Sequence, residues 1–94
     1  MGKAESIGDL LAVFFRENGM EQRMLGDQLI ELWPQVMGPQ VARLTGKIEI
    51  KNQVLFVQIR SAALRQQLFE CRTALIRKLN DSVGAQVIKD IRLR

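Results

Sequence analysis

The chain has 94 residues, of which 47% are hydrophobic and 26% charged, with a formal net charge of +4. This composition is typical of a globular chain, and the length suffices for one hydrophobic core, so we expect a single domain over residues 1–94. No apolar run approaches the ~20 residues that span a bilayer, which predicts a protein without membrane contact.

The cysteine content and the N-terminal residues bear on the cellular compartment. The only cysteine, Cys71, cannot form an internal disulfide, which is typical of a reducing environment. The first residues lack the apolar stretch and cleavage site of a secretion signal. The sequence therefore predicts a cytoplasmic protein.

Basic residues are concentrated in the second part of the chain. Residues 1–59 carry six basic and seven acidic side chains, whereas residues 60–94 carry eight basic and three acidic ones. Such an asymmetry indicates a polyanionic partner for the second part. A solubilising surface with a chance skew explains the same counts equally well.

Apolar residues at helical spacing predict two helices in the first part of the chain. The first is expected over residues 6–18 and is ended by Gly19. The second is expected from residue 20 or 21 to Trp33, because Pro34 lacks a backbone donor and should end or kink the helix. Further short helical turns are expected at residues 35–37 and 41–44.

From Gly46 onward, apolar and polar residues alternate with the period of a half-buried strand. A first strand contains Ile48 and Ile50, and Asn52-Gln53 is expected to form the tight turn of a hairpin. The second strand has two different faces. Leu55, Val57 and Ile59 are expected to face the core, and Val54, Phe56, Gln58 and Arg60 to face away from it.

A third helix is expected over residues 61–80, followed by an exit turn at Gly84 and a last strand over residues 87–94. Cys71 lies on the inward stripe of this helix, so we expect a buried and inert thiol. The other members of the stripe are Leu64, Leu68, Leu75 and Leu79.

The predicted element order is helix, helix, strand, strand, helix, strand. It favours an α+β fold in which helices cover one face of a three-stranded sheet. Such a domain resembles a KH domain of the second topological class (type II), with two differences. No two glycines form a Gly-x-x-Gly pattern, and one helix fills the space between the last two strands. Because KH domains hold the nucleic-acid backbone with that glycine loop, the resemblance implies a fold and not KH chemistry.

The residue inventory argues against an enzyme. The chain has no histidine, so the commonest general base and metal ligand is absent, and no histidine is available to activate Cys71. No Walker motif, dinucleotide-binding glycine motif or zinc or EF-hand spacing occurs. We therefore expect no catalytic residues, no metal, no cofactor and no small-molecule substrate.

One candidate binding surface lies on the predicted third helix. Arg65, Phe69, Arg72 and Ile76 share one stripe, where arginines can pair phosphates while an aromatic ring stacks a base. An alternative is that Phe69 widens the buried stripe and the arginine stems cover it. Arg77 and Lys78 extend the positive charge toward the C-terminal end of the helix.

A second candidate surface is the sheet face opposite the helices. An apolar Phe56 on such an open face indicates either base stacking or a partner's sheet, including a homodimer formed across this face. The charged residues expected on the same face are Lys47, Glu49, Lys51, Arg60, Asp90, Arg92 and Arg94.

A signature over residues 33–59 combines a tryptophan at a helix end, a glycine five residues later and a switch to strand periodicity. It resembles the DciA-like family of small bacterial proteins. The resemblance extends through Leu79-Asn80 to the last four residues. Within the signature, Trp33, Gly38, Leu55, Val57 and Ile59 form the structural core set, and Val36, Ala42 and Thr45 also match.

The resemblance implies a non-enzymatic accessory of DNA replication that helps load the replicative helicase. Together with the basic second part, it predicts weak binding of single-stranded DNA through basic residues. Two alternatives remain: an RNA-binding KH-like module, and a protein-interaction module that binds no nucleic acid. Longer relatives carry a C-terminal extension where part of the helicase contact is expected, and this chain stops at the predicted last strand.

Overall fold

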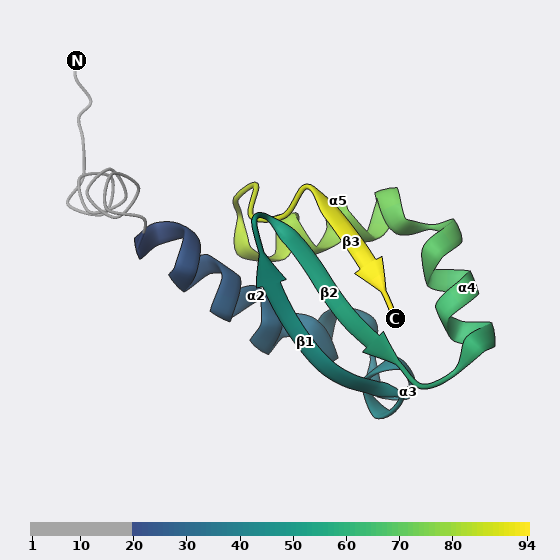
Figure 1. Cartoon of the computed structure of the whole chain (residues 1–94). Coiled ribbons are helices and arrows are strands. Elements are labelled where there is room, and N and C mark those ends of the chain that lie inside the picture. Colours follow the sequence, from purple (N-terminus) through teal and green to yellow (C-terminus); the bar gives the residue numbers. More distant parts are fainter. Residues whose placement is uncertain (1–19) are drawn as a thin grey trace, which may run out of the picture.

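The computed structural model describes residues 20–94, and the helix expected over residues 6–18 lies outside them. The described part is an α+β fold in which helices pack on a mixed three-stranded sheet, as expected from the sequence (Figure 1). Its elements are α2 (Met20–Met37), α3 (Pro39–Arg43), β1 (Thr45–Lys51), β2 (Val54–Ile59), α4 (Ala62–Glu70), α5 (Arg72–Val83) and β3 (Asp90–Leu93).

The strands lie in the order β1-β2-β3. β1 and β2 are antiparallel neighbours, joined by a two-residue turn at Asn52 and Gln53 whose φ angles are 53° and 65°. Two positive φ angles are the geometry that matches the twist of a hairpin, so the predicted turn is confirmed. β3 is parallel to β2, which requires a long crossover, and α4 and α5 provide it.

The core lies between the sheet and the helices α2 and α5. In Figure 1 these two helices lie behind the sheet, while the near face of the sheet is uncovered. Leu55, Val57 and Ile59 point to the covered face and are at most 1% exposed, so their predicted orientation is confirmed. Trp33 is 1% exposed and belongs to the same core.

The indole of Trp33 also connects three elements. Its Nε1 donates a hydrogen bond to Thr45 Oγ1 at 3.0 Å, and the Thr45 hydroxyl donates to the Val41 carbonyl at 2.7 Å. This satisfies the one polar atom of the buried ring, as buried tryptophan requires. α2, α3 and the start of β1 are thereby held at one corner of the core.

The prediction that α2 ends at Trp33 was wrong. The helix continues through Pro34 to Met37 and ends at Gly38, whose φ is 93°. A proline removes only its own backbone donor, so the helix can continue beyond it. The Gly38 amide then donates to the Pro34 carbonyl at 2.8 Å at the end of the helix. Because Val36 and Met37 still pack against the core, burial outweighs the lost hydrogen bond.

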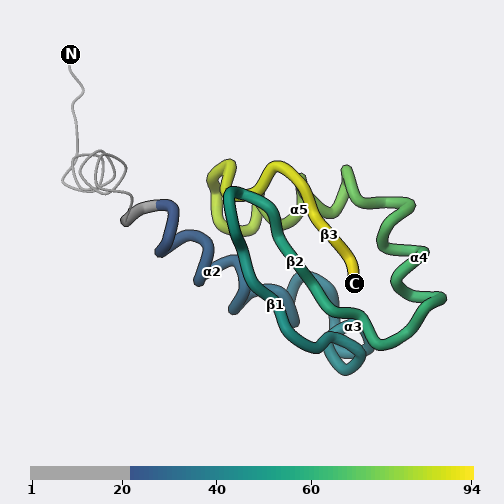
Figure 2. Tube along the Cα trace, in the orientation of Figure 1, coloured from purple at the N-terminus to yellow at the C-terminus, as the bar shows by residue number. Residues whose placement is uncertain are grey.

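The predicted third helix is two helices, α4 and α5, which meet at Cys71. This residue departs from helical geometry, with φ −113° and ψ 28°, and the chain changes direction there (Figure 2). The break lets α4 contact β2 and β3 while α5 packs against α2. Cys71 is exposed at this corner, so the expectation of a buried thiol was wrong.

The break also corrects the comparison with KH domains. Two helices, not one, lie between the last two strands, so that difference from the KH pattern disappears. The other difference stays, because the junction between α4 and α5 reads Glu70-Cys71-Arg72 and contains no glycine.

The last strand is shorter than expected and begins at Asp90, because the preceding residues form a loop built around Asn80. Val87 and Ile88 are buried in this loop, and both of their amides donate to Asn80 Oδ1, at 2.9 and 3.0 Å. Asn80 Nδ2 donates to the Ile88 carbonyl at 2.9 Å and to Gln86 Oε1 at 3.0 Å. One buried amide therefore replaces strand pairing for this segment.

Candidate nucleic-acid interface

The uncovered face of the sheet carries side chains that alternate with the core residues of the same strands. In the register of the sheet, Phe56 lies between Glu49 of β1 and Arg92 of β3. Phe56 is half-buried although no helix covers it. The reason is a neighbouring side chain, that of Arg94.

Arg94 follows β3 and reaches back across β2. Its guanidinium carbon lies 4.6 Å from the centre of the Phe56 ring, and its Nη1 lies 3.9 Å from Glu49 Oε2. The backbone fixes its position, because its amide donates to the Val57 carbonyl and its own carbonyl accepts from the Ile59 amide, both at 2.9 Å. Arg94 thus contacts both the Phe56 ring, through a cation–π contact, and the Glu49 carboxylate on the open face.

A β-bulge shapes one end of this face. The register of β1 and β2 shifts between Thr45 and Ile48, so one extra residue is accommodated in β1. The Gln58 side chain fills the space, and its Oε1 accepts from the Lys47 amide at 3.2 Å. A Cβ at Gly46 would require the end of the Gln58 side chain to move away, and with it the hydrogen bond to the Lys47 amide. The bulge leaves Lys47 beside the other cations of this face.

Arg65 approaches the same end of the sheet from α4. Ser61 caps this helix by accepting the Leu64 amide at 3.1 Å, which places Arg65 in its first turn. Arg65 Nη2 donates to the Ile59 carbonyl at 2.7 Å. Its Nε is buried and has no hydrogen-bond partner within the described part of the chain. The guanidinium is therefore held in place at the end of β2, with unused donor capacity.

These side chains surround a hollow of about 380 Å³, here called the basic hollow. Four cationic side chains and a single carboxylate line it, so it has an excess of positive charge. Because the surface is concave, the positive potential is focused there and attracts anions more strongly than on a flat surface. Its lining residues are Lys47, Glu49, Phe56, Gln58, Ile59, Arg60, Arg65 and Arg94.

The structure brings five of the residues expected from the sequence together in this hollow: Lys47, Phe56, Arg60, Arg65 and Arg94. Arg92 lies next to Phe56 in the register, but its Nε pairs with Asp90 at 3.2 Å. The remaining three basic residues lie elsewhere. Arg72 is at the corner between α4 and α5, and Arg77 and Lys78 are exposed on α5, in the helical layer.

The stripe expected on a single helix, from Arg65 through Phe69 and Arg72 to Ile76, does not exist as such. The break at Cys71 separates Arg65, which faces the basic hollow, from Arg72. Phe69 does not widen the buried stripe, since it is 49% exposed. Arg72 lies 4.2 Å from the centre of the Phe69 ring and donates to the Phe69 carbonyl at 2.9 Å. They form a separate exposed pair at the corner.

Asp90 marks the start of β3 on the open face. The Ile91 amide donates to its carboxylate at 2.8 Å, and this bond lowers the pKa of Asp90 below its ordinary value of 3.8. The hydrogen bond from Arg92 lowers the pKa further, as do the charges of Arg92 and Arg72. Asp90 is therefore ionised at neutral pH and neutralises part of the cationic character of this end of the strand.

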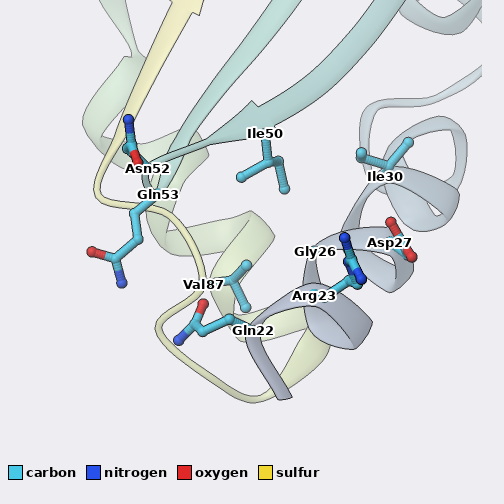
Figure 3. Close-up of a pocket in the computed structure, with 9 residues that line it drawn as sticks. All are labelled: Gln22, Arg23, Gly26, Asp27, Ile30, Ile50, Asn52, Gln53 and Val87. Carbon is cyan, nitrogen blue, oxygen red and sulfur yellow. The ribbon is translucent and has the colours of Figure 1, made fainter. Parts of the chain in front are cut away.

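A second hollow, of about 390 Å³, lies between the first half of α2 and the hairpin turn (Figure 3). Sequence periodicity gave no sign of it. Gly26 allows α2 to approach β1 closely there, since a Cβ would lie 3.3 Å from Ile50 Cδ1. This second hollow is lined by one basic residue, Arg23, and one acidic residue, Asp27, so it has no excess of positive charge.

Within residues 20–94, no group of three or more histidine, cysteine or acidic side chains is arranged to hold a metal ion. In the same range, no helix combines the length and the apolar character that a membrane span requires.

Fold and surface together define a small α+β domain whose uncovered sheet face carries a basic hollow beside an aromatic ring. The family described as Dna[CI] antecedent, DciA, matches residues 6–93. The chain belongs to this family, as its signature residues indicated. No curated protein matches the chain. The family is one of helicase-loading accessory proteins rather than of known enzymes, so membership supports a role in DNA replication and implies contact with the replicative helicase.

Proposed function

We propose that this protein is a non-enzymatic, cytoplasmic accessory of DNA replication that helps load the replicative helicase and binds single-stranded DNA weakly. The observation that carries the DNA-binding part is the basic hollow, which four cationic side chains and the half-buried Phe56 line together. Family membership supports the helicase part.

The chemistry of the open face suits a single strand. Guanidinium groups form paired, charge-assisted hydrogen bonds with phosphate oxygens, and Arg60, Arg65 and Arg94 present three of them to one hollow. A strand with unstacked bases can also place one on Phe56, which a duplex with stacked bases cannot do. Non-specific affinity is expected at about 10⁻⁴ to 10⁻⁶ M at physiological salt.

The interface proposed here is on the sheet rather than at the junction of α4 and α5. A KH-like protein with a glycine loop would hold the nucleic-acid backbone at that junction. In this chain the junction carries Cys71 and the Phe69–Arg72 pair instead. We therefore assign the main contacts to the basic hollow and secondary contacts to Phe69, Arg72, Arg77, Lys78 and Arg92.

Fluorescence anisotropy of labelled single-stranded DNA, duplex DNA and RNA across a salt series tests this function. The double variant Arg60→Ala with Arg65→Ala removes two phosphate contacts. It is expected to weaken single-strand binding about tenfold, since hydrogen bonds to charged groups are the stronger class. The log–log salt slope should become less steep by about 0.7, the value for one neutralised phosphate of a single strand.

The matched control is the double variant Arg23→Ala with Lys89→Ala, which removes the same charge from exposed positions outside the basic hollow and outside the secondary contacts. It is expected to retain most of the affinity. Equal losses in the two variants would reduce the effect to net charge, and no binding by the wild type at low salt would end the proposal. Because Arg65 is half-buried, Arg60→Ala with Lys47→Ala provides a second test if the first variant unfolds.

Tighter binding of RNA than of a matched DNA strand would favour the RNA-binding alternative. Loss of binding on dimer formation, seen by sedimentation, would show that the open face is a homodimer interface instead.

A further inference from the structure

Arg94 is the one cation of the basic hollow whose charge is already engaged by a carboxylate in the described residues. Glu49 lies at ion-pair distance from it, and its side chain is only 27% exposed. By contrast, Lys47 and Arg60 form no ion pair within residues 20–94. The cations of the basic hollow are therefore not all free to bind an anion. Arg94 must exchange Glu49 for a phosphate before it can bind that phosphate.

Both contacts of Arg94 are of a kind that a phosphate can replace. The ion pair is long, at 3.9 Å, and the Arg94 side chain is 57% exposed, so water screens the attraction. The contact with the Phe56 ring is a cation–π contact at an exposed site, which is also weak. An arginine–phosphate pair with two parallel hydrogen bonds is stronger than either.

Occupation of the hollow has a consequence for Phe56. While Arg94 lies over the ring, a base cannot stack on that side. When the guanidinium turns toward an anion in the hollow, the ring is uncovered, and Phe56 lines the same hollow as the cations. Phosphate binding and base stacking are thus linked through one side chain.

We propose that the basic hollow binds one backbone phosphate of single-stranded DNA between Arg60, Arg65 and Arg94, and that Arg94 must leave Glu49 and Phe56 to do so. The uncovered Phe56 ring then stacks a base of the same strand. Glu49 acts as a competing anion that lowers the affinity, so binding is weaker than the cations alone would give. This inference rests on the proposed binding of single-stranded DNA.

Substitution of Glu49 tests the competition directly. Glu49→Gln keeps the shape of the side chain and removes its charge, so Arg94 is released. We expect the affinity for single-stranded DNA to rise about two- to fivefold, the size expected for loss of a surface ion pair. Glu31→Gln removes the same charge from an exposed position on α2, in the helical layer, and is expected to change the affinity by less than Glu49→Gln.

An abasic strand separates the phosphate contact from stacking. Phe56→Leu keeps an apolar side chain but cannot stack, so affinity for ordinary single-stranded DNA should fall at least about fivefold. Affinity for an abasic strand of equal length should not change. A fall on both strands would show that Phe56 only supports the shape of the hollow, and would overturn the stacking step.

The movement of Arg94 has its own readout. In the free protein its side-chain protons lie near the Phe56 ring and should have ring-shifted NMR resonances. Saturation with single-stranded DNA should abolish that shift. If wild-type protein binds no strand, the proposed function fails together with this inference. If it binds, but Glu49→Gln behaves as Glu31→Gln or the Arg94 resonances do not move, only the exchange of partners is overturned.

Discussion

The two faces of the sheet come from the same three strands and differ in almost everything else. On the covered face, Leu55, Val57 and Ile59 are removed from water by α2 and α5. On the open face, alternate residues of the same strands hold cations around Phe56. Burial of apolar surface concentrates stability on the first face. The second face is free to carry charge because the fold does not depend on it.

The largest expected effect comes from the core behind the covered face. Trp33→Ala removes a side chain that is 1% exposed and leaves a cavity, and the Thr45 hydroxyl keeps only its hydrogen bond to the Val41 carbonyl. We expect a loss of about 3–5 kcal/mol in the free energy of unfolding, measured by chemical denaturation. Phe56→Ala on the open face should cost clearly less. Comparable losses would mean that the open face contributes to stability as much as the covered face does.

An intermediate effect is expected at Asn80, the buried polar residue that holds the loop before β3. Asn80→Ala leaves the Ile88 amide without its acceptor in a buried setting, whereas the Val87 amide keeps its hydrogen bond to the Ala85 carbonyl at 3.0 Å. The free energy of unfolding should fall by about 2 kcal/mol or more. The matched control is Gln86→Ala, which removes an exposed hydrogen-bond partner of the Asn80 side chain. The free energy of unfolding should change by about 0.5 kcal/mol or less, as is usual for surface substitutions. Equal losses would contradict the role assigned to Asn80.

The smallest effect concerns charge on the open face. Because the folded-state pKa of Asp90 lies below its ordinary value of 3.8, the ionised carboxylate stabilises the fold above that pH. The contribution is lost as the pH falls further, through the folded-state pKa. The side chain is 40% exposed, so solvent screening limits the contribution to roughly 0.5 kcal/mol or less.

Asp90→Asn should therefore be slightly less stable than the wild type at pH 7, and the two should converge as the pH falls below 3.8. Thermal unfolding of the variant and the wild type at pH 7 and at a pH below 3.8 measures the difference in stability. A gap that stays constant with pH would show that the carboxylate charge plays no part.

Sequence reasoning succeeded where a local pattern decides the structure. Alternation in β2 placed Leu55 and Phe56 on opposite faces, and the turn at Asn52-Gln53 was recognised from residue type. It failed where a local rule met tertiary packing. Pro34 was expected to end or kink the helix, which was given an end at Trp33, but core contacts beyond Pro34 extend it to Met37. The regular leucine spacing across Cys71 predicted one helix, because spacing along the chain does not report a change of direction.

The candidate site divides in the same way. The open-face members were predicted from strand alternation alone, since alternate residues of a strand share a face. The position of Arg65 was not, because it follows from the capping of α4 by Ser61 and a hydrogen bond to the Ile59 carbonyl. The bulge at Gly46 and the contact of Arg94 with Glu49 join residues distant in sequence, and no local signal marks them.

Sequence alone indicated the family, the α+β class, the two faces of the sheet and the concentration of basic residues after residue 59. These follow from side-chain period and composition, which are properties of neighbouring residues. Only the tertiary structure decided which basic residues meet. The Ser61 cap and the hydrogen bond to the Ile59 carbonyl hold Arg65 against β2, and the break at Cys71 separates it from Arg72. The end of β3 brings Arg94 back over Phe56. Basic residues form a binding site only when packing brings their side chains within reach of one ligand.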